Sequence, residues 1–483
     1  MKFDLKKRYC FYFNELSMIP RGSGDEKKAC EWVAEFAKQN NLYCHQDSVG
    51  NTVIRKPGSK GHENEPYLMI QAHLDMITEK DPGIVHDFKK DPLDLYEEDG
   101  YLKARGTTLG ADDGVGVAYM MAILEDVNLV HSPLECVFTV QEETGLVGAM
   151  KMKPRDILSR RCISLDGGGE TTAMSCAAGG IKGEIRKKLI WKPADRRMQA
   201  YTIEVSGLLG GHSGVVIGEG RGNAIRILAR VLNDMKQNGL KIQLAELNGG
   251  RGDNMIPSDA EALILCTEKE SSAVKKTVSR QLKQIRDEFA DSDSGIQIRI
   301  RKAALPKEVL DNDSYASMLA MLLLLPNGVE AVSIPLEGLP VTSNNLGRIV
   351  LPQDGNMILY FRIRSLLQSA MDDVLSRVCT AAEAFDAKVS ITTQYPGWNY
   401  QKVSVLRDHF QKLVKEIYHH DIEIEGTHGG NETGIWSSLH PETDIICIGS
   451  IEENIHTTKE KLYLEAFDRE YKLLCRLIEM CAE

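Results

Sequence analysis

The chain has 483 residues, which exceeds one ordinary domain and predicts two or three. Its 42% hydrophobic and 26% charged residues are typical of a soluble globular protein, and its net charge of −11 argues against nucleic acid or an anionic membrane as partner. The 11 cysteines show no CxxC spacing, so we expect neither a disulfide framework nor a zinc knuckle. The basic first residues lead into no apolar segment, which predicts a cytoplasmic protein without a signal peptide.

The first 60 residues are predicted to form a helix and then two short strands. Ser23 and Asp25 are candidate caps of a helix that reaches about Asn40, since apolar residues recur there at helical spacing. The segment 43–54 favours two strands around Gly50-Asn51.

Strands and helices then alternate, which predicts an α/β layered domain. Three strand-like segments end in polar residues: 67–70 before His73-Leu74-Asp75, 134–140 before Glu142-Glu143, and 161–165 before Asp166. A helix at about 115–125 follows Asp112. Because ligands in such sheets bind beyond the C-terminal strand ends, we expect these side chains to lie together.

After about residue 180 the pattern changes to two successions of strand, helix and strands. The first begins at 200 and includes a helix at 223–237; the second begins near 296 and includes helices at 315–325 and 369–386. The element order favours an inserted α+β domain with a duplicated topology, although no sequence repeat is evident. The α/β pattern returns near 395, with helices expected at 404–418 and 458–481.

Seven residues form one chemical set: His73, Asp75, Asp112, Glu142, Glu143, Asp166 and His456. Imidazole and carboxylate ligands without thiolate suit zinc, with manganese and cobalt as alternatives. Two histidines and three carboxylates suffice for two divalent ions when one carboxylate bridges them, and such a pair activates a water molecule. A further carboxylate must then accept the proton of that water, so one glutamate of the adjacent pair would bind metal and the other act as base.

Seven segments occur in an order and at intervals that are highly specific: His73-Leu74-Asp75-Met76, Val85-His86-Asp87-Phe88, 104–112, Glu142-Glu143-Thr144-Gly145, Gly211-His212-Ser213-Gly214, Asn345-Leu346-Gly347 and His456. This series resembles the M20 metallopeptidase family, most closely its aminoacyl-histidine dipeptidase branch, over almost the whole chain. The resemblance implies a discontinuous catalytic domain, 1–180 and 396–483, with a mixed, mostly parallel sheet between helices. Residues 181–395 would form the inserted lid domain.

The resemblance also implies a role for each member of the set. Five residues would hold two metal ions: His73 and Asp166 the first, Glu143 and His456 the second, and Asp112 both. Glu142 would be the general base, and Asp75 would orient His73 through the second ring nitrogen. The peptide bond between Asp112 and Asp113 is expected to be cis.

In this family the lid carries groups that complete the site. His212 would contact the carbonyl oxygen and its developing oxyanion, and Asn254 would bind substrate. Arg364 would grip the C-terminal carboxylate of the substrate with its bidentate guanidinium group. Arg362, two residues earlier on the same strand face, stays open as an alternative.

The chain departs from the family pattern at two places. Relatives usually read Gly-Leu-Glu-Cys-Gly where this chain has Gly430-Asn431-Glu432-Thr433-Gly434, and Asp113 stands where asparagine is common. Neither change removes a metal ligand, so we expect the first to alter substrate preference rather than metal binding.

The implied activity is two-metal hydrolysis of unblocked dipeptides, Xaa-His dipeptides included. Alternatives are an N-acyl amino acid deacylase or a tripeptidase on the same scaffold and, in another class, an inactive metal-binding regulatory protein. The complete set of ligands and base argues against inactivity. The expected partner is a small peptide, with no nucleic acid and no membrane, and both a monomer and a homodimer stay open.

Overall fold

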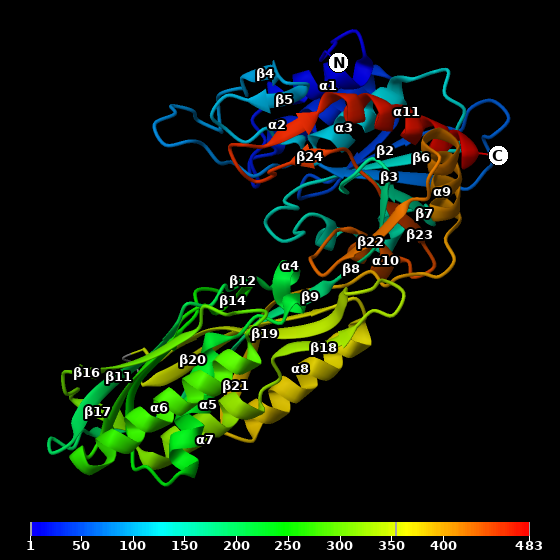
Figure 1. Ribbon diagram of the computed structural model, residues 1–483. Helices are drawn as coiled ribbons and strands as arrows, with labels where there is room; N and C mark the ends of the chain where they lie inside the picture. Colours follow the sequence, from blue (N-terminus) through cyan, green and yellow to red (C-terminus); the bar gives the residue numbers. More distant parts are fainter. Residues whose placement is uncertain (1, 353–354, 483) are drawn as a thin grey trace. The chain divides into compact units, whose positions relative to one another are not determined.

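A computed structural model describes residues 2–352 and 355–482, which fall into two compact units (Figure 1). The first unit comprises Met1–Ala177, Gly397–Gly426 and Asn431–Glu483. The second comprises Ala178–Pro396 and Thr427–Gly430. Within the described residues, no helix is long and apolar enough to cross a lipid bilayer.

The first unit is built on an eight-stranded sheet with parallel strands at its centre. Its strands in spatial order are β1 (Tyr43–Gln46), β2 (Thr52–Lys56), β6 (Leu134–Thr139), β3 (Leu68–His73), β7 (Arg161–Ser164), β23 (Asp444–Cys447), β8 (Thr172–Ala177) and β22 (Glu423–Thr427). The pairs β6–β3, β3–β7 and β7–β23 are parallel, whereas β1–β2, β2–β6 and β23–β8 are antiparallel. β3 and β6 are buried along their whole length, as in strands covered on both faces. The predicted mixed α/β class is confirmed.

The helices of this unit are α1 (Arg8–Ser17), α2 (Lys27–Gln39), α3 (Ala111–Glu125), α9 (Val405–Tyr418), α10 (Thr433–Leu439) and α11 (Leu464–Met480). α3 packs against β3 and α1 and is buried on nearly every side, because its residues are small or apolar throughout. This helix therefore holds the segment around Asp112 in the interior of the unit.

Two predictions about this unit are wrong in detail. The last helix begins at Leu464 instead of 458, because Lys461–Tyr463 forms β25. β25 belongs to a small sheet in the order β24 (Glu452–Glu453), β25, β5 (Tyr101–Ala104) and β4 (Leu95–Glu98). Ser23 does not cap α2, since its hydroxyl donates to Asp75 Oδ2 at 2.7 Å instead.

The second unit contains a nine-stranded antiparallel sheet. Its main path runs β16 (Gln297–Ala303), β11 (Gln199–Ser206), β15 (Ala260–Cys266), β13 (Gln243–Gly249), β19 (Pro340–Val350), β20 (Asn356–Ser365), β9 (Gly179–Lys188) and β21 (Ala387–Tyr395), and β18 (Gly328–Val332) pairs with β19. The longer helices are α5 (Ala224–Gln237), α6 (Glu268–Glu288), α7 (Asn312–Leu324) and α8 (Gln368–Glu383).

The strand order shows a duplicated topology, as predicted, but the division between the halves differs from the prediction. The strand near 296, expected to open the second succession, is β16 of the first half because it pairs with β11, and β9 opens the second half. One half runs β11-α5-β13-β15-α6-β16 along the chain and pairs in the order β16-β11-β15-β13. The other runs β9-α7-β19-β20-α8-β21, with the first half inserted after β9, and pairs in the order β21-β9-β20-β19. The halves meet where β13 pairs with β19 through Gly249 and Ile349. Each half thus contributes four strands of the main path and two helices, with β18 added beside β19 in the second half, and the two halves join edge to edge.

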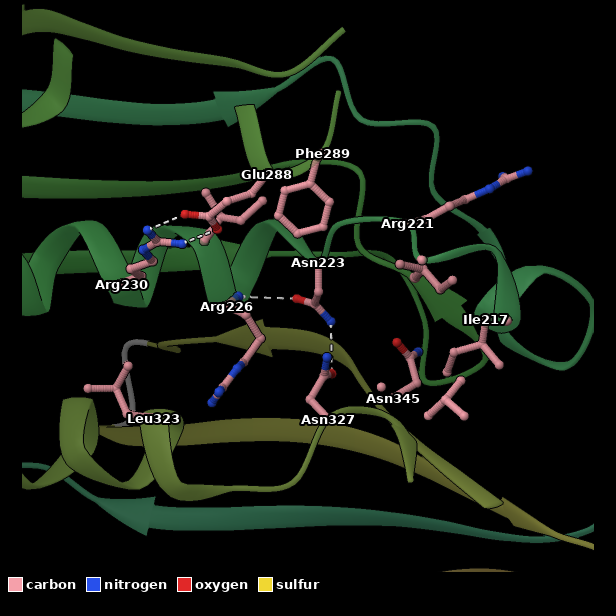
Figure 2. Close-up of a pocket in the computed structure, with 16 residues that line it drawn as sticks. Ile217, Arg221, Asn223, Arg226, Arg230, Glu288, Phe289, Leu323, Asn327 and Asn345 are labelled. Carbon is pink, nitrogen blue, oxygen red and sulfur yellow. Dashed lines mark hydrogen bonds and ion pairs between the residues drawn. The ribbon is translucent and has the colours of Figure 1, made fainter. Parts of the chain in front are cut away.

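Asn223 fastens the start of α5 to the other half of this unit. Its Oδ1 accepts hydrogen bonds from the backbone N–H groups of Ile225 (3.1 Å) and Arg226 (3.2 Å). Its Nδ2 donates to Asn327 Oδ1 (3.1 Å) and to the Leu346 carbonyl (3.0 Å), as Figure 2 shows in part. A side chain that caps a helix and bridges two segments contributes more than a cap alone.

A cavity of about 540 Å³ lies beside Asn223 (Figure 2). Three arginines line it, and each has a partner: Arg230 binds Glu288 at 2.5 Å, Arg221 binds Glu219 at 2.7 Å, and Arg226 donates to the Leu322 carbonyl. Two of the three guanidinium charges are thus paired with a carboxylate.

Replacing Asn223 with Ala should lower the free energy of unfolding by about 2–3 kcal/mol, because the cap and both donated bonds are lost. Asn223→Ser keeps a cap acceptor and should lose about half as much. Chemical unfolding, with hydrogen exchange of the first turn of α5, measures both. Asn238→Ala, at an exposed asparagine after the same helix, is the matched control. An alanine variant as stable as that control would contradict the assignment.

Candidate metal centre

The predicted ligands gather at one edge of the sheet in the first unit. β6, β3 and β7 are adjacent and parallel, so their C-terminal ends lie at the same edge. His73 is the last residue of β3, the Glu142-Glu143 pair follows β6, and Asp166 follows β7. Asp112 is the second residue of α3, and His456 comes from the connection between β24 and β25.

The carboxylate of Asp112 lies between two histidines. Its Oδ1 is 3.0 Å from His73 Nε2, and its Oδ2 is 3.1 Å from His456 Nε2. His456 Nε2 is also 2.8 Å from Glu143 Oε1. His73, Asp112 and Glu143 can each offer one ligand atom within 4.8 Å of the others. The fifth predicted ligand, Asp166, is not hydrogen-bonded to these four within the described residues; its partner is Asn431.

The cluster buries an excess of negative charge. Burial raises the pKa of Glu142 and of Asp166 well above their ordinary values, and neighbouring carboxylates raise both further. Burial also acts on Asp112, but hydrogen bonds from His456 and His73 hold its pKa well below the usual range. Such a set of buried carboxylates requires cations, and with two imidazoles it offers the nitrogen and oxygen ligands that divalent metals bind. The residues present therefore fit a metal site.

Asp75 lies beside the second ring nitrogen of His73 and has further partners. Its Oδ1 is 3.5 Å from His73 Nδ1, while that nitrogen is 3.1 Å from the Asp75 backbone carbonyl. The Asp75 carboxylate accepts hydrogen bonds from the backbone N–H groups of Glu142 (3.0 Å) and Glu143 (3.2 Å). Asp75 thus fixes the glutamate pair to the end of β3 as well as lying beside His73.

Two buried charged residues that the sequence analysis missed hold the backbone around the site. The Arg21 guanidinium donates to the carbonyls of Leu74 and Asp75, both at 2.9 Å, and to the Gly110 carbonyl. The Glu460 carboxylate accepts from the backbone N–H groups of three consecutive residues, Leu109 at 2.7 Å, Gly110 at 3.1 Å and Ala111 at 2.7 Å. Together they tie the segment before Asp112 to the segment after His73. Only position in the fold reveals these contacts, because their partners are backbone groups.

Asp113 and Glu432 are further buried acids near the cluster. The bond between Asp112 and Asp113 is cis, as expected. Asp113 accepts from the backbone N–H groups of His73 (3.2 Å) and Gly116 (3.1 Å), and burial raises its pKa to about 8. Glu432 accepts from the Thr139 hydroxyl at 2.7 Å, and burial raises its pKa to about 7.

The three predicted lid residues lie in the second unit, and the structure brings two of them together. Arg364 Nη2 is 3.5 Å from His212 Nε2. Arg364 Nη1 is 3.4 Å from the Tyr395 hydroxyl and 3.5 Å from the His428 carbonyl. Arg364 is 4% exposed, its Nε has no partner, and no carboxylate of the described residues is bonded to it. Within the described residues it is therefore a buried cation that no carboxylate binds directly.

The alternative arginine is already paired. Arg362 Nε donates to Asp253 Oδ2 at 2.8 Å, and Arg362 Nη2 is 2.6 Å from the same oxygen. The backbone carbonyl of Asn254 accepts a hydrogen bond from the Ser213 backbone N–H at 2.8 Å. The backbone of Asn254 therefore lies beside His212. Within the described residues, no hydrogen bond joins the Asn254 side chain to His212 or Arg364.

The chain is similar to known peptidases in sequence and in fold. Residues 69–480 match the family model described as peptidase family M20/M25/M40. The cytosol non-specific dipeptidase of Escherichia coli (strain K12) is 32% identical over 467 residues, which are 97% of this chain and 96% of that protein. The crystal structure of aminoacylhistidine dipeptidase from Vibrio alginolyticus matches with a TM-score of 0.93 at 27% identity, covering 98% of this chain and 96% of that chain. Aminopeptidase PepT from Bacillus cereus, at 17% identity, a TM-score of 0.58 and full coverage of both chains, shares the fold. The chain belongs to peptidase family M20/M25/M40.

Proposed function

We propose that the protein is a cytoplasmic two-metal dipeptidase that hydrolyses unblocked dipeptides, Xaa-His dipeptides among them. The observation that carries this proposal is the Asp112 carboxylate, whose two oxygens each face a histidine beside the Glu142-Glu143 pair. The dipeptidase relatives named above, of nearly the same length as this chain, support the substrate class.

Five residues of this chain would hold the two ions. His73 and Asp166 would bind the first ion, Glu143 and His456 would bind the second, and Asp112 would bind both. Zinc is our first choice, because the ligands are imidazole and carboxylate, and manganese and cobalt are the alternatives. When bound, the ions polarise the scissile carbonyl and lower the pKa of a bound water molecule.

Glu142 would act as the general base. It takes the proton of the attacking water and later gives it to the leaving amine, so that the peptide C–N bond breaks with a neutral amine as product. Asp75 supports this role, since it binds the backbone N–H groups of both Glu142 and Glu143 and so keeps the base at a fixed place beside a metal ligand.

The second unit would supply the substrate-binding groups. Arg364 would bind the C-terminal carboxylate of the dipeptide, because it is buried and lacks a carboxylate partner whereas Arg362 is occupied by Asp253. Burial and the charge of Arg364 lower the pKa of His212, so a neutral imidazole N–H would donate to the developing oxyanion. Asn254 would bind the substrate beside it.

A hydrolysis screen of unblocked dipeptides, tripeptides and N-acyl amino acids tests the substrate class. We expect dipeptides to have the highest kcat/KM. A higher value for tripeptides or for N-acyl amino acids would replace the proposal with the corresponding peptidase or deacylase. Absence of turnover on every class, with metal bound, would favour the regulatory alternative.

Replacing Glu142 with Ala or Gln should leave the metal content unchanged and lower kcat by about 1000-fold or more, the size of a general-base contribution. Metal analysis and steady-state kinetics on the same preparations check both parts. Activity within tenfold of wild type would remove Glu142 from the role of base.

Removal of metal with a chelator should abolish hydrolysis and lower the melting temperature, because ions that bind only the folded state stabilise it and here also neutralise buried carboxylates. Activity and melting temperature should both return on addition of Zn²⁺, Mn²⁺ or Co²⁺, and the ion that restores the highest activity at equal occupancy is the best cofactor candidate. Full activity of the metal-free protein would overturn the proposal.

Arg364→Ala should lower kcat/KM for a dipeptide with a free C-terminus by about 100-fold, the loss of a charge-assisted bidentate contact. The corresponding dipeptide amide lacks the carboxylate and should change much less. Arg362→Ala is the matched control on the same strand and should produce a smaller, unselective effect. An equal loss on the acid and the amide would argue against Arg364 as the carboxylate clamp.

A further inference from the structure

Asn431 is hydrogen-bonded to Asp166, a proposed metal ligand. Its Nδ2 donates to Asp166 Oδ2 at 2.9 Å and is 3.4 Å from the Asp166 backbone carbonyl. The Asn431 side chain is buried, with 5% of the residue exposed. Both residues belong to the first unit, on the same side of the cluster as the end of β7.

The orientation of the Asn431 amide is fixed from its other end. Asn431 Oδ1 accepts hydrogen bonds from the backbone N–H of Thr433 at 3.0 Å and from the Thr433 hydroxyl at 2.8 Å. A backbone N–H can only donate, so the amide oxygen must face Thr433. The NH₂ group of Asn431 must then face Asp166. Because Thr433 is fully buried, water does not compete for these bonds.

We propose that Asn431 is a positioning residue that sets the carboxylate of Asp166 for metal binding. The amide engages Oδ2 of Asp166 and leaves Oδ1 as the atom that would bind the ion. This inference rests on the proposed function, in which Asp166 and His73 hold one of two metal ions.

Asn431 and Thr433 are the two residues at which the chain departs from the Gly-Leu-Glu-Cys-Gly pattern. A leucine side chain offers no donor to Asp166, and a cysteine thiol is a weak donor to an amide. Asn431 and Thr433 therefore act as a pair, in which Thr433 orients the amide and the amide orients the ligand. Asn431 and Thr433 would consequently act on the metal site. The sequence analysis expected these two residues to alter substrate preference instead.

Asn431 also binds N–H groups at the start of α10, and this structural role must be separated from the proposed one. The Thr433 N–H that binds its side chain and the Gly434 N–H that binds its carbonyl at 3.1 Å both lie at the start of α10. Loss of these bonds would change stability, whereas loss of the bond to Asp166 would change metal affinity. Partners of metal-ligating groups typically contribute 10–100-fold in metal affinity.

The test compares Asn431→Ser and Asn431→Leu with wild type. Serine keeps an acceptor for the Thr433 N–H but is too short to reach Asp166, and leucine removes both contacts. Zn²⁺ affinity is measured for each equivalent by competition with a chromophoric chelator, and the visible spectrum is recorded after loading with Co²⁺. We expect one of the two Zn²⁺ equivalents to weaken by about 10–100-fold in both variants, the other to stay within twofold, and the Co²⁺ spectrum to change.

Thr433→Val is the graded control. It removes the hydroxyl but keeps the backbone N–H to Asn431 Oδ1, so the weakened equivalent should lose less affinity than in Asn431→Ser. Unfolding curves of all variants measure the loss of stability at the start of α10 separately from metal affinity. If the leucine variant does not fold, the Zn²⁺ affinity of the serine variant tests the inference.

Two Zn²⁺ equivalents with wild-type affinity in Asn431→Ser would overturn this inference and leave the proposed function intact, as would a fall in stability alone. A wild-type protein that binds no Zn²⁺, Mn²⁺ or Co²⁺ would overturn the proposed function, and this inference with it.

Discussion

The burial of several carboxylates at one sheet edge is the constraint on which the site depends. Burial raises the pKa of Glu142 and Asp166, because a charged carboxylate in a low dielectric is costly unless a cation lies beside it. The two histidines beside Asp112 lower the pKa of the Asp112 carboxyl group. They offset only part of the negative charge of the cluster. The fold therefore holds several carboxylates together whose charge metal ions would neutralise. The buried strands fix these side chains in the interior, where water cannot solvate them.

A cluster of like charges stays together only if the backbone under it is held. Arg21 and Glu460 provide this support: Arg21 binds backbone carbonyls, and Glu460 binds the N–H groups before Asp112. Asp75 does the same for the Glu142-Glu143 pair. Charged groups that bind peptide groups rather than one another are therefore as much a part of the site as the ligands themselves.

Four candidate ligands, His73, Asp112, Glu143 and Asp166, could be found from the sequence because each lies at the end of a buried strand or at the start of a helix, and such patterns are local. The same holds for the α/β class. The duplication is also visible in the element order, but only the pairing of β16 with β11 shows to which half that strand belongs. His456 and the role assigned to each ligand rest on the resemblance to the M20 family. What local patterns miss is set by distant partners: the bond of Ser23 to Asp75 replaces a helix cap, and the pairing of β25 with β5 shortens the last helix. α6 escapes prediction because only 5 of its 21 residues are buried, which leaves a weak apolar stripe.

The duplicated second unit builds its candidate substrate site at the junction of its two halves. His212 and Asn254 come from the first half, while Arg364 comes from β20 of the second. Asn345 on β19 donates to the carbonyls of Asp253 (2.9 Å) and Met255 (2.8 Å), and so fastens the loop of one half to a strand of the other. In the part of the chain that the structure describes, β13 pairs with β19 through Gly249 and Ile349 alone, so these side-chain bonds help set the junction. A duplication thus gives this unit two nonequivalent halves, and the residues that would bind substrate come from both.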